Sequence, residues 1–106
     1  LYYCEPVHLV ETESVFLQWL SEPILAENER YMVEVIDLTN VDSHPRRLFT
    51  RSSGVTLPAD WMPTEEHDFI WRVSLVEIDG RRENGGFIYT IVGAESVPRY
   101  FSWGSS

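Results

Sequence analysis

The fold is decided by one stretch of the chain, Asp68-Phe69-Ile70-Trp71-Arg72-Val73-Ser74-Leu75-Val76-Glu77-Ile78. Two sets of side chains alternate along it with a period of two, which is the spacing of a β-strand and not of a helix. Aromatic and β-branched residues dominate the stretch, and these residue types favour strands. The stretch therefore predicts a long β-strand with Trp71 on its buried face.

The same alternation recurs along the chain, and turn residues such as Asp79-Gly80 and Asn84-Gly85-Gly86 separate the alternating runs. No 12-residue window carries the apolar stripe of an amphipathic helix. Short strands at this spacing predict an all-β antiparallel sandwich. The expected strands are residues 7–10, 14–20, 30–38, 47–50, 55–57, 68–78, 86–92 and 99–103, with 86–92 as the hairpin partner of 68–78.

The composition limits the possible functions. The chain has 106 residues, a formal net charge of −9, eight arginines and no lysine. Without lysine it has neither a Walker-type phosphate loop nor Schiff-base chemistry, and so acidic a chain is not expected to bind nucleic acid. Its apolar runs are too short for direct membrane insertion. We interpret 1–106 as a single domain, a fragment of a larger protein, with 102–106 as the start of a linker.

Cys4 is the only cysteine. A single thiol excludes an internal disulfide and a zinc site built on several thiolates. Three roles stay open for Cys4: a free thiol, an intermolecular disulfide, or a lipid attachment site.

Short motifs, in order along the chain, resemble the fibronectin type III family. Residues 14–19 match the family's alternating second strand, which ends in a buried tryptophan, and Tyr31-Met32-Val33 matches the Tyr-x-Val of its third strand. Val55-Thr56-Leu57 suits the short strand that follows. Trp61-Met62-Pro63 takes the place of the family's Leu-x-Pro turn before the long strand.

One feature of that family is missing. Its corner tyrosine is replaced by His67 or Phe69, depending on how the turn is counted. A phenylalanine there lacks the hydroxyl that pins the corner. The resemblance covers residues 6–103. It implies an antiparallel immunoglobulin-like (fibronectin III-type) sandwich of about seven strands, of the divergent kind found in bacterial envelope proteins.

The four tryptophans have different predicted roles. Trp19 and Trp71 fall at inward positions on separate strands, so we expect them to meet in the core. Trp61 is expected to plug one end of the sandwich. Trp103 ends the last strand, where it belongs either to the core, as aromatic residues at strand spacing usually do, or to an exposed surface. An exposed Trp61 or Trp103 could stack on a sugar ring.

The second face of the long strands is also partly apolar. Met32, Ile36 and Ile70 lie on it. Either loops cover these side chains, or they form an exposed patch that meets a partner. With Trp61 and Trp103 they make up the possible interaction surface, and the arm formed by residues 80–92 is a second candidate.

The segment Glu65-Glu66-His67-Asp68 gathers three carboxylates around an imidazole. It is either a divalent-cation site or a solvated acidic loop. The spacing of an EF-hand, the Gly-x-Ser-x-Gly elbow and the His-Glu-x-x-His motif are all absent from the sequence. We therefore predict no catalytic residue and assign no cofactor or metal.

These observations favour a non-catalytic module, which acts as a spacer or protein-interaction domain of a larger surface or envelope protein. Its partner would be another protein or a neighbouring domain of the same chain, in an extracellular or envelope location. The alternative is a carbohydrate-binding module, in which exposed Trp61 or Trp103 stacks on a polysaccharide.

Overall fold

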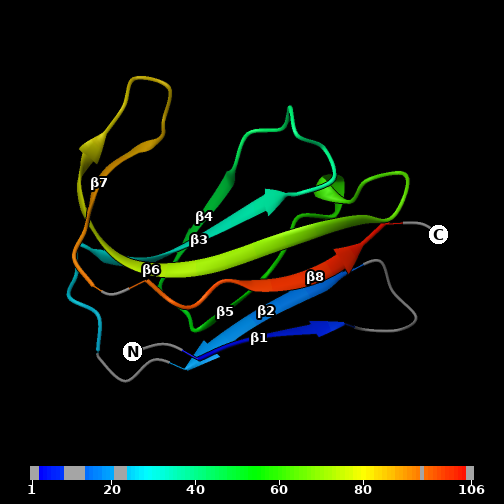
Figure 1. Ribbon diagram of the computed structural model, residues 1–106. Coiled ribbons are helices and arrows are strands. Elements are labelled where there is room, and N and C mark those ends of the chain that lie inside the picture. Colours follow the sequence, from blue (N-terminus) through cyan, green and yellow to red (C-terminus); the bar gives the residue numbers. More distant parts are fainter. Residues whose placement is uncertain (1–2, 9–13, 21–23, 94, 105–106) are drawn as a thin grey trace.

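A computed structural model describes residues 3–8, 14–20, 24–93 and 95–104 and shows two antiparallel β-sheets (Figure 1). The smaller sheet has the order β1-β2-β5, with β1 (Tyr3–His8), β2 (Val15–Leu20) and β5 (Gly54–Thr56). In the larger sheet, of order β4-β3-β6-β7, β8 also pairs with β6. Its strands are β3 (Glu29–Asp37), β4 (Arg46–Thr50), β6 (His67–Arg81), β7 (Phe87–Ile91) and β8 (Arg99–Trp103).

The prediction of an all-β antiparallel sandwich is confirmed, and a strand is found near each of the eight predicted positions. The first strand begins at Tyr3, four residues before its predicted start, and residues 9–10 of that prediction lie outside the described part of the chain. A second difference lies at the end of β6. The sequence predicted a turn at Asp79-Gly80, but β6 continues to Arg81 through a register shift between Ile78 and Gly80. The reversal comes later, at Gly85, whose φ of 90° favours glycine.

Helical structure is limited, within the described ranges, to the 3-10 helix η1 (Ala59–Trp61). The backbone N–H of Trp61 donates to the carbonyl of Pro58 at 3.0 Å, and this single turn places Trp61 at the end of the sandwich. None of the described segments forms a helix with the length and apolar character needed to cross a membrane.

The core lies between the two sheets. Trp19 of β2 and Trp71 of β6 meet there with their ring centroids 6.4 Å apart, which confirms the prediction for both. Tyr31 of β3 packs edge-on against Trp19 at 5.5 Å. Within the described residues, neither indole N–H has a hydrogen-bond acceptor.

The outer face of the larger sheet carries a second apolar cluster. Met32 of β3 is buried there, 1% exposed, so for this residue the alternative of cover is confirmed and that of an exposed patch is wrong. Phe49 of β4 lies opposite Met32 in the strand register, and it packs against Phe87 and Tyr89 of β7 at 5.0 and 5.5 Å. The curled end of β6 carries β7 into this position (Figure 1), so cover by the arm accounts for the burial of Met32.

A buried carboxylate lies beside this cluster. Glu34 of β3 is only 5% exposed. Its oxygens accept hydrogen bonds from Arg47 Nε of β4 at 3.0 Å and from Arg72 Nε of β6 at 2.8 Å. The hydrogen bond with Glu34 raises the pKa of Arg72, so this cation keeps its proton. Although Glu34 faces outward, its carboxylate is bound by two arginines and is shielded from water. Its charge therefore helps to hold the strands of the larger sheet together.

The predicted start of the linker, residues 102–106, overlaps the folded domain. Ser102 and Trp103 belong to β8, where they pair with Asp68 and His67 of β6. Gly104 has a φ of 124°, and a Cβ at this position would collide with the backbone of Glu65. These three residues belong to the folded domain, whereas residues 105–106 lie outside the described part of the chain.

Candidate functional site

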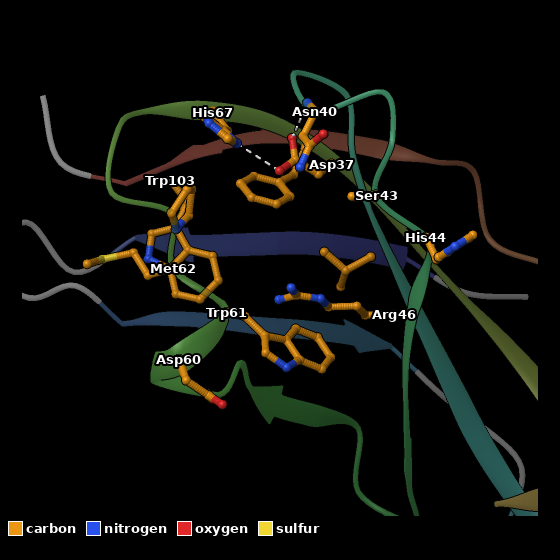
Figure 2. Close-up of a pocket in the computed structure, with 13 residues that line it drawn as sticks. Asp37, Asn40, Ser43, His44, Arg46, Asp60, Trp61, Met62, His67 and Trp103 are labelled. Atoms are coloured by element: carbon orange, nitrogen blue, oxygen red, sulfur yellow. Dashed lines mark hydrogen bonds and ion pairs between the residues drawn. The ribbon is translucent and has the colours of Figure 1, made fainter.

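A pocket of about 190 Å³ opens at one end of the sandwich (Figure 2). The end of β3, the β3–β4 loop, the start of β4 and the start of β6 form its polar side. The 3-10 helix η1 contributes Trp61, and the end of β8 contributes Trp103. Elements from four separate parts of the sequence therefore meet at this one site.

Asp37 is the best-anchored polar group of the pocket. One carboxylate oxygen accepts the backbone N–H groups of Thr39 and Asn40 at 2.9 and 3.0 Å, which fixes the turn after β3. The other oxygen lies 2.7 Å from Nδ1 of His67 (Figure 2). Burial alone would raise the pKa of Asp37, but these hydrogen bonds, led by that of His67, together lower it.

Arg46 and Trp61 form the second polar element. The Arg46 guanidinium carbon lies 5.3 Å from the ring centroid of Trp61, which is the geometry of a cation–π contact. Figure 2 shows the Arg46 side chain reaching across the pocket in front of the indole ring. One face of Trp61 is thereby covered by a cation. Trp61 lies at the end of the sandwich, where the sequence predicted it.

The floor of the pocket is apolar. Trp103, only 5% exposed, packs against Phe69 with the ring centroids 6.0 Å apart. Phe69 also stacks on Phe101 at 5.1 Å. Of the two alternatives for Trp103, burial in the core is confirmed and exposure is wrong, because β8 places its side chain in the core between the sheets. A buried Trp103 has no free ring face for stacking on a sugar.

The other predicted surface residues lie elsewhere, on the outer face of the larger sheet. Ile36 of β3 pairs with Ile70 of β6, and Ile70 pairs with Tyr100 of β8. Ile36 and Ile70 are half-buried, whereas Tyr100 is 70% exposed. The structure thus separates the predicted surface into an end pocket with Trp61 and Trp103, and an apolar row on the sheet face.

The three carboxylates of residues 65–68 do not gather around His67. His67 turns to Asp37, and Asp68 accepts a hydrogen bond from the Ser102 hydroxyl at 2.9 Å. Glu65 and Glu66 are exposed. Within the described ranges, no three His, Cys, Asp or Glu side chains are arranged to hold a metal ion.

The sequence reasoning missed Asp37 and Arg46. Asp37 had a local signal, since an Asp at a strand end with Thr39 and Asn40 after it is typical of a side-chain-capped turn. Its pairing with His67, 30 residues away, had no signal in one sequence. Arg46 was equally hidden, because its contact with Trp61 depends on how β4 and η1 meet.

Cys4 lies in β1, where its backbone pairs with that of Trp19. The structure describes nothing of its side chain, so the three roles predicted for it remain open.

Two comparisons with known proteins give no relative. No family model matches the chain, and no curated protein matches it.

Proposed function

We propose that this chain is a non-catalytic module of the fibronectin type III kind, which serves as a spacer or protein-interaction domain of a larger extracellular or envelope protein. The observation that carries the proposal is the division of the strands between the sheets. Strands β1, β2 and β5 form one sheet, and β3, β6 and β8 belong to the other, as in immunoglobulin-type sandwiches. Strand β4 belongs to the larger sheet, together with β3, β6 and β8.

His67 supports the same assignment. It stands at the start of β6, and positions 67 and 69 are the two at which the resemblance places the family's corner tyrosine. Its Nδ1 contacts Asp37 at 2.7 Å and so ties the start of β6 to the end of β3. Counted at position 67, the corner has this side-chain contact in place of the family's tyrosine hydroxyl.

Asp37 holds this contact in place. One of its oxygens accepts two backbone N–H groups, and the other contacts His67. In the proposed module this Asp–His pair has a structural role, because it joins the end of β3 to the start of β6.

The apolar row Ile36–Ile70–Tyr100 is the surface that we propose for protein interaction. Its three side chains are cross-strand neighbours on β3, β6 and β8, and Leu38, 42% exposed, lies at the end of β3 beside it. Exposed apolar side chains that adjoin one another mark interaction sites more strongly than scattered ones do.

Photo-crosslinking in the parent protein tests this surface. A photoreactive phenylalanine derivative replaces Tyr100, and a matched control places it at Thr56, which is exposed on β5 of the opposite sheet. We expect a discrete protein adduct from position 100 only, and its loss when Ile70→Asp is added. If positions 100 and 56 give the same pattern, the interaction role is wrong and a spacer remains.

A further inference from the structure

Arg46 differs from several other arginines of the chain in how it is held. Arg47 and Arg72 share the carboxylate of Glu34, and Arg51 donates to four backbone carbonyls. Arg46 lies over Trp61 and, among the described residues, forms neither an ion pair nor a hydrogen bond from its guanidinium. Arg46 is exposed, and within the described part of the chain its five N–H donors have no protein acceptor, so a ligand can take them.

The contact with Trp61 prepares Arg46 for binding. A guanidinium that rests on an aromatic ring has a fixed plane, so less side-chain entropy is lost when it binds a ligand. A planar guanidinium matches a carboxylate through two parallel hydrogen bonds. The pocket therefore presents a pre-oriented carboxylate receptor.

The two acids of the pocket leave room for such a ligand. Asp37 is occupied by His67 and by the turn after β3. Asp60 lines the same pocket, but Figure 2 shows its carboxylate directed away from Arg46. His44 lies on the opposite rim. The charge that faces the centre of the pocket is that of Arg46.

The size and lining narrow the choice of ligand. About 190 Å³ is smaller than the roughly 300–1,000 Å³ of pockets for drug-sized molecules, so the pocket suits a single side chain or a chain end. Its floor is apolar, formed by Phe69, Trp103 and Val35. A sugar would need a free aromatic face, and Arg46 covers one face of Trp61. These features favour a protein ligand over a polysaccharide.

We infer that the end pocket binds a carboxylate of a partner protein, either an acidic side chain or a C-terminus, with Arg46 as the receptor and Trp61 as its support. The inference rests on the proposed interaction function. It adds a second contact point, at the end of the sandwich, to the apolar row on the sheet face.

Titration of the ¹⁵N-labelled chain, followed by NMR, tests the inference. The probes are N-acetylglycine, which carries only a terminal carboxylate, N-acetylglutamate α-amide, which carries only a side-chain carboxylate, and glucuronate. We expect saturable shifts of the Trp61 indole N–H and of residues around Arg46 with one or both peptide carboxylates, at roughly millimolar concentrations. Their uncharged amides should cause no shift.

Arg46→Gln should weaken this binding about tenfold or more, because it removes a charge-assisted hydrogen-bonding group. Arg81→Gln is the matched control, since Arg81 also lies over an aromatic ring, that of Phe87 at 4.7 Å, in the distant β6–β7 arm. It should leave the dissociation constant unchanged. The amide spectrum of each variant verifies its fold.

The inference is overturned if no peptide carboxylate gives a saturable shift, or if Arg46→Gln binds as well as the original chain. Binding of glucuronate alone would also overturn it, in favour of a sugar ligand. Either failure leaves the crosslinking from Tyr100 untouched, because Tyr100 lies on the outer sheet face and not in the pocket. The two proposals can therefore fail separately.

Discussion

Both faces of the larger sheet carry buried side chains, but different interactions bury them. The inner face packs against the other sheet through rings such as Trp71. The outer face has no second sheet over it among the described residues, yet Met32, Ser74 and Val76 are buried there. Aromatic side chains from β4 and β7 and the ion pairs of Glu34 lie on this face instead.

This difference shows that alternation along a strand predicts which face a side chain occupies, but not whether that face is shielded from water. The inner face is covered by the opposite layer of the sandwich, as any sandwich requires. The cover of the outer face depends on the bend of β6 near Gly80, which folds the arm back. We therefore expect substitutions on the inner face to affect the whole domain, and those on the outer face to act more locally.

Trp71→Ala should have the largest effect on stability. The Trp71 side chain is fully buried, so we expect a loss of about 3–5 kcal/mol in the free energy of unfolding. Trp71→Phe should lose less than half as much, because it also removes an indole N–H that lacks a described acceptor. Urea unfolding followed by circular dichroism measures both.

Leu20→Ala serves as the control for Trp71, because Leu20 is a large apolar residue that is exposed. Its loss should stay within about 0.5 kcal/mol. Equal effects of Leu20→Ala and Trp71→Ala would contradict the assignment of the core.

Glu34→Gln should come next, with a loss of about 2 kcal/mol. The amide keeps the shape of Glu34 but removes the charge that Arg47 and Arg72 share. The loss stays below that for a fully buried pair, because both guanidinium groups are more than a third exposed and regain water. Chemical unfolding at two salt concentrations measures it. An equally large loss from exposed Glu83→Gln would show that overall charge, and not this ion pair, is responsible.

Phe87→Ala should have a smaller and more local effect. Phe87 is half-buried and meets Phe49 edge-on at 5.0 Å, so we expect a loss of about 1–2 kcal/mol. Hydrogen exchange should accelerate for the amides of β7 and change little for those of β3. Uniform acceleration across both strands would mean that the arm and the core unfold as one unit, and the contrast between the faces would disappear.

Most of the fold could be predicted from the sequence, because strand alternation is a local property. The run 68–78 located β6, and inward parity was sufficient to bring Trp19 and Trp71 together. The continuation of β6 past Asp79-Gly80 could not be predicted, since the same dipeptide suits a turn or a bulge. The pairing with β7 decides between the two.

The candidate site could be predicted only in part, for a similar reason. Trp61 was placed at the end of the sandwich because a turn motif precedes the long strand. The burial of Met32 and Trp103 depends on what covers them, which is set by segments far away in the sequence. The pairs Arg46–Trp61 and Asp37–His67 join residues 15 and 30 positions apart, and no local pattern encodes such a pair.

Asp37→Asn should have the smallest effect at neutral pH and the clearest pH dependence. Each face of the larger sheet carries one carboxylate that is fixed by hydrogen bonds. Glu34 is bound by arginines, whereas Asp37 is bound by a histidine and two backbone N–H groups. The folded-state pKa of Asp37 lies below its ordinary value of about 3.9. Its contribution is therefore fully present above about pH 4, and it disappears as the pH falls through the lowered folded-state value.

The difference in unfolding free energy between the original chain and Asp37→Asn isolates this contribution from that of the other acids. We expect a difference of about 1 kcal/mol at pH 6, which shrinks towards zero as the pH falls through the lowered folded-state pKa of Asp37. Asp42→Asn, at an exposed residue of the β3–β4 loop, should show almost no difference at either pH. A gap for Asp37→Asn that stays constant down to low pH would mean that the amide disturbs the turn itself, because an ionisation effect must vanish once the carboxylate is protonated in both states.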